Sequence, residues 1–307
     1  MFAEIQSVPG ADQWLSCERL TLGWSSDQKY IVRLPDGRRL LLRTAKEDQY
    51  ETKRQEFAFL EKLAVLGLNA SRPLDFGRFE GGVYTLYTWV EGESMEKALP
   101  SLPVGLQYQL GLEAGRALRL IHTLPAPEGT PAWTDRMNRK IDRKIKMARE
   151  CELEIPGREA MIRYIDAHRH LLENRPQVMH HGDYHCGNLL LTPDGQVGVI
   201  DFNRFDAGEP WEEFKRIVWC AQASPAFASG RINGYFTAEG TVPADFFPLV
   251  TLYILSNQLS SLPWAIPFGQ EEIDVMLRQA KEVLSWYDGC TRDVPAWYLT
   301  DEQAAQL

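Results

Sequence analysis

Residues 181–202 constrain the fold of this chain more than any other segment. Two short apolar runs flank the turn-forming residues Thr192-Pro193-Asp194-Gly195, and this pattern predicts a β-hairpin over residues 189–200. Oxygen-bearing side chains stand at both ends of the hairpin, namely Asp183, Asn188 and Asp201. Because a hairpin folds the chain back on itself, the spacing is expected to bring the last of these residues beside the second.

The three residue types suit a metal-dependent phosphoryl transfer. Such a reaction uses one carboxylate to orient the acceptor hydroxyl and take its proton, and Asp183 is the candidate for this catalytic base. Mg²⁺ takes oxygen ligands, so Asn188 and Asp201 are the candidate metal ligands. Each residue alone could instead be an ordinary turn or capping residue. Their joint spacing favours the catalytic interpretation.

The string His181-Gly182-Asp183, with Asn188 five residues on and Ile200-Asp201-Phe202 after the hairpin, resembles the active site of the aminoglycoside phosphotransferase family. These are kinase-like enzymes that act on small molecules. The resemblance implies an α+β, bilobal, protein-kinase-like fold with a small β-rich N-lobe and a larger, mostly helical C-lobe. It also implies that His181 supports the loop through a hydrogen bond.

The chain divides accordingly into three parts. Residues 1–90 are expected to form the nucleotide-binding N-lobe, residues 91–103 the hinge and linker, and residues 104–307 the helical C-lobe with the catalytic and acceptor sites. Alternation and turn signals predict N-lobe strands at 20–22, 29–34, 39–44 and 83–90, with a helix at 51–66. Apolar periodicity predicts C-lobe helices at 107–122, 135–151, 158–174, 211–223, 245–262 and 270–287.

The nucleotide side departs from the usual kinase pattern. A kinase N-lobe holds phosphate with a lysine paired to a helix glutamate, and here Arg43 stands at that position with Glu56 as its partner. Arginine can hold phosphate bidentately, although it does not replace an ammonium group without cost. Lys46 is an alternative cation. Two serine hydroxyls in the first loop, Ser25 and Ser26, could offer donors to phosphate. The backbone of Thr88 and Val90, in the segment that resembles the family hinge, would read the base.

The segment after the metal carboxylate also matches the family. Residues 206–214 lead from a turn into a helix, and Glu213 falls where an aspartate is more usual. Its expected role is to brace the catalytic loop. Arg204 is close enough in sequence to Asp201 to contact phosphate or to brace a carboxylate, and the sequence does not separate these two roles.

Charge favours a cationic partner. The net charge is −9, and the whole acidic excess lies after residue 90. Nucleic acid is a poor partner for such a surface, whereas a cationic small molecule would be attracted to it. The basic run at 139–149 is interpreted as a solvated helix face rather than an anion site. The sequence shows no membrane span, and the five scattered cysteines fit a reducing compartment, which makes the cytoplasm the expected location.

These observations predict transfer of the γ-phosphate of ATP or GTP, with Mg²⁺, to a hydroxyl of a small molecule. An aminoglycoside is the preferred acceptor, which would make the chain an antibiotic-resistance kinase. The related scaffold also serves kinases of macrolides, choline, fructosamines, methylthioribose and homoserine, and these remain alternatives. A nucleotide-binding pseudokinase is a further alternative, motivated by Arg43. A protein kinase is disfavoured because ten residues after Asp201 are too few for an activation segment. Nothing in the sequence indicates an oligomeric state.

Overall fold

The structure is a computed structural model that describes residues 5–21 and 27–307. The chain forms two compact units. The first consists of residues 1–93 together with 190–203, and the second of residues 94–189 together with 204–307. The first unit therefore includes Asp201 and all of the hairpin except Leu189. The division into a nucleotide-binding lobe, a linker and a catalytic lobe stays a prediction.

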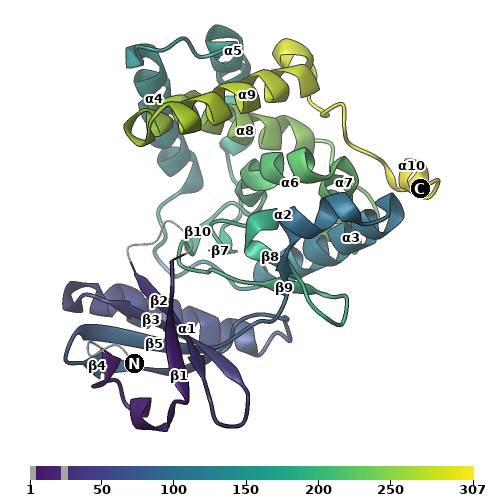
Figure 1. Cartoon of the computed structure of the whole chain (residues 1–307). Helices are drawn as coiled ribbons and strands as arrows, with labels where there is room; N and C mark the ends of the chain where they lie inside the picture. Colours follow the sequence, from purple (N-terminus) through teal and green to yellow (C-terminus); the bar gives the residue numbers. More distant parts are fainter. Residues whose placement is uncertain (1–4, 22–26) are drawn as a thin grey trace. The chain divides into compact units, whose positions relative to one another are not determined.

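The first unit is built on a five-stranded antiparallel sheet (Figure 1). Its spatial order is β1-β2-β3-β5-β4. The sheet is accompanied by the helix α1 (Tyr50–Ala64) and the 3-10 turn η3 (Glu47–Gln49). The strands are β1 (Ser16–Leu20), β2 (Gln28–Arg33), β3 (Arg39–Ala45), β4 (Pro73–Phe79) and β5 (Gly82–Thr88).

Alternation along the strands explains the core of this sheet. In β3, Leu40 and Leu42 are buried on one face, where Tyr30 and Val32 of β2 also pack. The N-terminal segment with the turn η2 (Ala11–Gln13) contributes Trp14 and its neighbours to the same cluster. The opposite face of β3 carries a buried charged residue, Arg43. One face of the sheet is thus an apolar core, and the other presents the candidate phosphate-binding cation.

The hairpin predicted around residues 189–200 is present. Its strands β8 (Leu189–Leu191) and β9 (Val197–Val199) join β6 (Glu93–Ser94) in a three-stranded sheet of order β6-β8-β9. Gly195 closes the turn with a positive φ of 79° and donates its N–H to the Thr192 carbonyl at 2.9 Å. The Val199 N–H donates to the Asn69 carbonyl at 2.8 Å, which fixes the strand that leads to Asp201.

The second unit is mainly helical (Figure 1). A two-stranded antiparallel sheet pairs β7 (Val178–His180) with β10 (Asp206–Gly208). Its helices are α2 (Met95–Ala98), α3 (Val104–Ile121), α4 (Trp133–Glu150), α5 (Arg158–His168), α6 (Ile217–Ala223), α7 (Pro225–Tyr235), α8 (Phe246–Ala265), α9 (Gln270–Trp286) and α10 (Asp301–Ala304). Its 3-10 turns are η4 (Leu99–Ser101), η5 (Arg169–Leu172), η6 (Cys186–Asn188), η7 (Pro210–Arg216), η8 (Ile266–Phe268) and η9 (Asp288–Cys290).

Two packing devices organise this unit. Helices α3 and α7 approach so closely that a Cβ atom added at Gly111 would lie 2.3 Å from the Phe227 carbonyl oxygen, and one at Gly230 would lie 2.3 Å from that of Tyr108. Glycine on both helices is what permits this contact. Helix α8 is buried around most of its circumference and packs against α4, α5 and α9. Of these neighbours, α4 also lines the pocket beside the catalytic loop that is described below.

Most predicted elements are confirmed, with shifts of a few residues at their ends. The helix expected at 158–174 is a correction, because α5 ends at His168 and the chain tightens into η5. The helix expected at 211–223 is instead η7 followed by α6, since Glu209 and Pro210 set a 3-10 start. The strand expected at 20–22 lies earlier, at β1, and residue 22 is outside the described residues. Strand β4 and helix α7 were not predicted, because their glycines and prolines mask the pattern.

Within the described residues, no helix has the length and apolar character needed to cross a membrane.

Candidate active site

The catalytic loop lies between β7 and η6 in the second unit. Gly182 has φ of 86°, and a Cβ atom added there would lie 1.7 Å from the Arg204 carbonyl oxygen. This position therefore requires glycine both for its backbone conformation and for space. The buried His181 accepts a hydrogen bond on Nδ1 from the Asp183 N–H at 3.2 Å. The loop is thus held from within, and Asp183 follows directly.

Glu213, on η7, holds the same loop from outside. Its carboxylate accepts hydrogen bonds from the His181 N–H at 2.7 Å and from the Gly182 N–H at 2.8 Å. The side chain is fully buried. Burial, the largest single influence, raises the pKa of this carboxyl, but the hydrogen bond with His122 and the electrostatic effects of His180, His122 and His181 together outweigh it, so the pKa of Glu213 is well below its ordinary value. A permanently charged carboxylate with two backbone donors can fix the approach to Asp183.

The surroundings of the Asp183 carboxylate are basic. Oδ1 lies 3.1 Å from Nε of Arg216, and Oδ2 lies 3.5 Å from Nη1 of Arg204. His185 is 3.8 Å away, but burial lowers the pKa of its ring to about 4, so this histidine is neutral at pH 7. The two guanidinium groups are therefore the charged neighbours of the candidate base. Arg204, whose role the sequence left open, contacts a carboxylate here.

The side-chain amide of Asn188 is oriented by a hydrogen bond. Its amide nitrogen donates to the Asp183 carbonyl oxygen at 3.0 Å. This contact uses the Nδ2 end of the amide and fixes the position of Oδ1, the atom that can bind a cation. The structure therefore brings two of the three predicted residues together within the second unit.

Asp201 belongs to the first unit, directly after the hairpin. Its φ of 64° is left-handed, a conformation that a residue other than glycine adopts rarely and often at functional sites. Its Oδ1 lies 3.2 Å from Nη1 of Arg43, and its Oδ2 lies 3.4 Å from Nζ of Lys29. The candidate metal carboxylate is thus held between two cations of neighbouring strands.

Arg43 stands at the centre of a buried charge network. Its Nη2 lies 2.7 Å from Asp27 and its Nη1 lies 3.5 Å from Glu56, so the predicted pair is in contact. Lys53 reaches the same two carboxylates, at 2.6 and 3.0 Å. Burial alone would lower the pKa of Arg43, but the surrounding carboxylates, with Glu56 the strongest, raise it. Both side chains are buried, so this pair is not a surface contact.

Three members of this network were not expected from the sequence: Lys29, Lys53 and Asp27. The signal for Lys29 was the antiparallel pairing of β2 and β3, which sets Lys29 directly opposite Arg43. Lys53 lies one helical turn before Glu56, a spacing that places both on one side of α1. The alternative cation, Lys46, is exposed at the start of η3.

The base-reading residues stay predictions. Thr88 ends β5 and exchanges two hydrogen bonds with Arg72, because its N–H donates to the Arg72 carbonyl and its hydroxyl accepts from the Arg72 N–H, both at 2.9 Å. Val90 is half-buried just beyond. Ser25 and Ser26 lie outside the described residues.

Each candidate metal ligand by itself is of a type that suits Mg²⁺. Asp201 supplies a carboxylate and Asn188 an oriented amide, and Mg²⁺ prefers such oxygen donors together with water and phosphate oxygens. The contacts of Asp201 with Arg43 and Lys29 show that its carboxylate faces cationic charge in this structure. A metal ion would take over part of that compensation.

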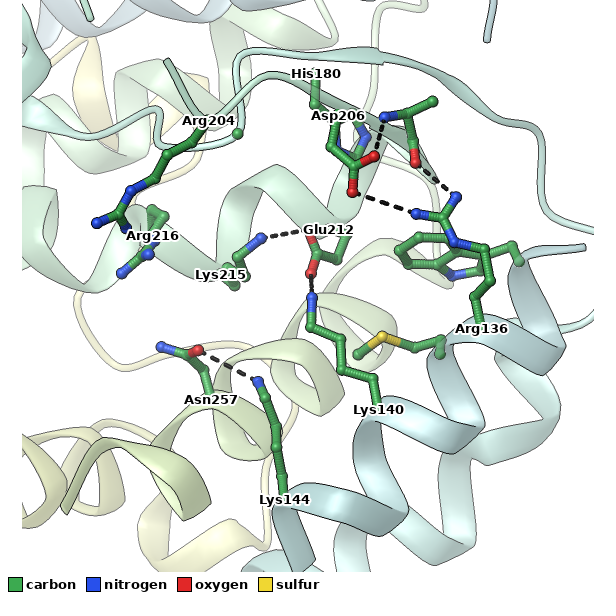
Figure 2. Close-up of a pocket in the computed structure, with 14 residues that line it drawn as sticks. Arg136, Lys140, Lys144, His180, Arg204, Asp206, Glu212, Lys215, Arg216 and Asn257 are labelled. Atoms are coloured by element: carbon green, nitrogen blue, oxygen red, sulfur yellow. Dashed lines mark hydrogen bonds and ion pairs between the residues drawn. The ribbon is translucent and has the colours of Figure 1, made fainter. Parts of the chain in front are cut away.

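A pocket of about 440 Å³ opens beside the catalytic loop (Figure 2). Gly182, Arg204 and Arg216 line it on the side of Asp183, and α4 lines it on another side. Lys140 and Lys144 of α4 point into this space (Figure 2). Its volume is in the range of sites for small organic ligands. All of its lining residues belong to the second unit.

Comparison with known proteins shows which family the chain resembles. The family model described as APH, phosphotransferase enzyme family, matches residues 16–247. No curated protein matched the chain. Among solved structures, the chain is similar to the GDP complex of a mutant aminoglycoside 2'-phosphotransferase-IIIa, with a TM-score of 0.67, 16% identity, and coverage of 94% of this chain and 97% of that chain.

Two further solved structures are similar over nearly the same extent. One is a choline/ethanolamine kinase family protein from Mesorhizobium loti, with a TM-score of 0.65, 14% identity, and coverage of 94% of this chain and 95% of that one. The other is a thermostable mutant of aminoglycoside phosphotransferase APH(4)-Ia in a ternary complex with ADP and hygromycin B. Its TM-score is 0.61 and its identity 16%, with coverage of 88% of this chain and 94% of that one.

Similarity at such low identity establishes the fold, and it confirms the kinase-like α+β architecture expected from the sequence. The family model spans more than half of the 307 residues and includes Arg43, Asp183 and Asp201. The chain therefore belongs to the APH phosphotransferase enzyme family.

Proposed function

We propose that this chain transfers the γ-phosphate of ATP or GTP, with Mg²⁺, to a hydroxyl group of a small molecule. The observation that carries the proposal is the loop in which Asp183 is presented by a glycine turn and by the buried Glu213 carboxylate. A rigidly positioned carboxylate is what a phosphotransferase needs for its acceptor.

Each residue has a definite task in the proposed reaction. Asp183 orients the acceptor hydroxyl and takes its proton as the oxygen attacks the γ-phosphorus. The bond between that phosphorus and the β–γ bridging oxygen breaks, and the nucleoside diphosphate leaves. Asn188 and Asp201 would hold Mg²⁺, which supplies charge neutralisation for the phosphates. Glu213 and His181 keep the loop in place.

The phosphates of the nucleotide are assigned to two cations of the first unit, the buried Arg43 and the half-buried Lys29. Arg43 is oriented by Asp27 and Glu56, and Lys29 stands opposite it on the neighbouring strand. Two cations from adjacent strands can share the task that one lysine performs in other kinases. Thr88 and Val90 are proposed to read the base with their backbone, and Ser25 and Ser26 to donate to phosphate.

Aminoglycosides are the acceptors named for several of the similar structures, in complexes with kanamycin, gentamicin and hygromycin B. That support concerns proteins that share 13–16% of their residues with this chain. An aminoglycoside acceptor would make the chain a resistance kinase. A growth assay in a susceptible bacterium tests this acceptor directly, since expression should then raise tolerance to at least one aminoglycoside.

The test of the reaction itself is Asp183→Asn. Turnover with an accepted substrate should fall by about 10²–10⁴-fold, because the base is lost, while nucleotide affinity changes little. Rates are to be measured under single-turnover conditions so that chemistry limits them. A variant that keeps more than about a tenth of the wild-type rate would remove Asp183 from this role.

The alternative is a nucleotide-binding pseudokinase, and the contact of Arg43 with Asp201 is the observation that favours it. A pseudokinase would bind nucleotide with an affinity independent of Mg²⁺ and would show no Asp183-dependent turnover. Calorimetry with and without Mg²⁺ separates the two functions.

A further inference from the structure

The pocket beside the catalytic loop has an excess of positive charge. Two of its lining residues are acidic, Asp206 and Glu212. Six are basic, namely Arg136, Lys140, Lys144, Arg204, Lys215 and Arg216. Even if Asp183 is added because it contacts two of these arginines, three carboxylates face six basic side chains. The charge of the pocket is therefore opposite in sign to the net charge of the chain.

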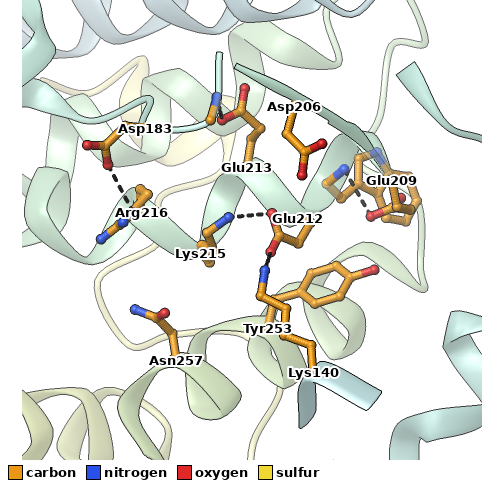
Figure 3. Close-up of polar contacts among 12 residues, drawn as sticks. Lys140, Asp183, Asp206, Glu209, Glu212, Glu213, Lys215, Arg216, Tyr253 and Asn257 are labelled. Atoms are coloured by element: carbon orange, nitrogen blue, oxygen red, sulfur yellow. Dashed lines mark hydrogen bonds and ion pairs between the residues drawn. The ribbon is translucent and has the colours of Figure 1, made fainter. Parts of the chain in front are cut away.

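The carboxylates of the pocket are shared between cations. Glu212 accepts hydrogen bonds from Lys140 at 2.9 Å and from Lys215, and the dashed lines at Glu212 in Figure 3 mark these contacts. Asp183 is likewise flanked by Arg204 and Arg216. Each of these two carboxylates therefore neutralises at most one of its two cationic neighbours, and positive charge is left over on both sides of the pocket.

The excess of positive charge in the pocket is clearest at Lys144. This residue is 8% exposed, and its ammonium group donates to the amide oxygen of Asn257 at 3.3 Å, a neutral partner (Figure 2). Burial and the neighbouring Lys140 lower the pKa of Lys144 to about 7. A buried lysine that faces other cations costs stability, and an anion bound beside it would remove that cost.

The chemistry of the lining indicates which anion fits. The donors come from α4, from Arg204 just before β10, and from η7, so they surround the space from several directions. A carboxylate has two oxygens and one charge, which a single arginine can satisfy. A phosphate monoester has three terminal oxygens and nearly two charges. Trp133 and Met137 add an apolar wall for a carbon skeleton.

We infer that the hydroxyl acceptor of this chain already carries a phosphate group, which binds in the basic pocket while a hydroxyl of the same molecule faces Asp183. The inference rests on the proposed function and names its acceptor class. The reaction is the one given above, with a bisphosphorylated product and a nucleoside diphosphate. A polyamine acceptor such as an aminoglycoside would instead meet uncompensated like charge in this pocket.

Binding of inorganic phosphate tests the pocket without any turnover. Calorimetry at constant ionic strength, with chloride replacing phosphate in the reference, should show saturable binding by the wild-type chain. Lys144→Met should weaken it at least tenfold, and so should Lys140→Gln. Lys146→Met is the matched control, because Lys146 lies on the same helix with its side chain 73% exposed. The phosphate affinity of this variant should equal that of the wild type. Thermal unfolding checks that each variant is folded.

Turnover tests the acceptor class. Glycerol, ribose and kanamycin are to be compared with glycerol 3-phosphate and ribose 5-phosphate, with ATP and GTP as donors. The phosphate esters should be preferred, and Lys144→Met should raise their KM at least tenfold while the nucleotide KM stays within twofold. Lys146→Met should leave both values unchanged.

The outcomes separate the two proposals. Phosphate affinity that is equal in Lys144→Met and Lys146→Met, or preferred turnover of kanamycin, overturns the anionic acceptor and leaves the phosphotransferase intact. Phosphate binding that depends on Lys144, without Asp183-dependent turnover of any compound, overturns the proposed function and with it the assignment of this phosphate to an acceptor.

Discussion

The guanidinium group of Arg43 lies 3.2 Å from the carboxylate of Asp201. The cation proposed to hold phosphate and the carboxylate proposed to hold the metal are thus in contact within the first unit. Because Asp27 and Glu56 also contact Arg43, this arginine compensates charge on three carboxylates at once. In this structure Arg43 and Asp201 compensate each other's charge. Bound Mg²⁺ would supply a cation to Asp201, and bound nucleotide would supply an anion to Arg43.

Arg43→Met should therefore affect stability as well as nucleotide binding. The change leaves buried carboxylates without their main partner, and we expect the free energy of unfolding to fall by about 3–5 kcal/mol. Urea denaturation measures this loss, and calorimetry measures the nucleotide affinity. Arg38→Met is the control, because Arg38 is 72% exposed and its pair with Asp36 contributes little. Equal stability of the two variants would contradict the assignment of Arg43 as the main partner of these buried carboxylates.

The two candidate metal ligands should differ in their effect on nucleotide affinity. Asp201→Asn removes a charge while keeping the shape and a residue that tolerates the left-handed backbone, so Mg²⁺-dependent nucleotide affinity should fall strongly. Asn188→Ala removes a neutral ligand and should have a smaller effect on affinity. Nucleotide titrations with Mg²⁺ and with a chelator measure both. If the two variants and the wild type bind nucleotide equally and independently of the metal, the site is wrongly assigned.

Gly182→Ala should disable the catalytic loop. The added Cβ would lie 1.7 Å from the Arg204 carbonyl oxygen, so the loop must move, and turnover should fall at least tenfold with roughly 2 kcal/mol or more of lost stability. Gly195→Ala is a matched control, since φ is similar at 79° and no atom lies within 4 Å of the added Cβ. That variant should lose only about 1–2 kcal/mol of stability and keep its activity. Similar activities of the two variants would argue against a tightly held loop.

Lys144→Met should stabilise the chain near neutral pH. The pKa of Lys144 is about 7 in the folded chain and near its ordinary value of 10.5 when unfolded, so the unfolded state binds more protons between these values. The wild type therefore gains stability from this group as pH rises from 7 to 10.5, and the cost is fully present below pH 7. The melting temperature of Lys144→Met should exceed that of the wild type at pH 7, and the difference should shrink toward pH 10.

Lys146→Met serves again as the control for this pH series, because an exposed lysine has no burial cost to remove. A difference between Lys144→Met and wild type that is constant over the range would show that the Lys144 ammonium is not penalised by burial.

The sequence determined the local chemistry of the catalytic segment. Asp183, Asn188 and the hairpin before Asp201 lie close together along the chain, so their spacing and turn residues are sufficient to predict the loop and the strands. The bracing role expected for Glu213 came from the family resemblance, and the hydrogen bonds to His181 and Gly182 give it a geometric basis. Helical periodicity likewise predicted α3, α4 and α9, because apolar residues recur at helical spacing along their buried faces.

Tertiary structure alone decided where charge is concentrated. The basic run of α4 was interpreted as a solvated face, and Arg139, Arg143 and Arg149 are indeed exposed, yet Lys140 and Lys144 turn inward. Which side of a helix is covered depends on the elements that pack against it, here η7 and α8, and no local pattern encodes them. In the same way, Lys29 meets Arg43 only through strand register. Net charge sums over the whole surface, whereas a binding pocket responds to the few charges that line it, and folding selects those from distant parts of the chain.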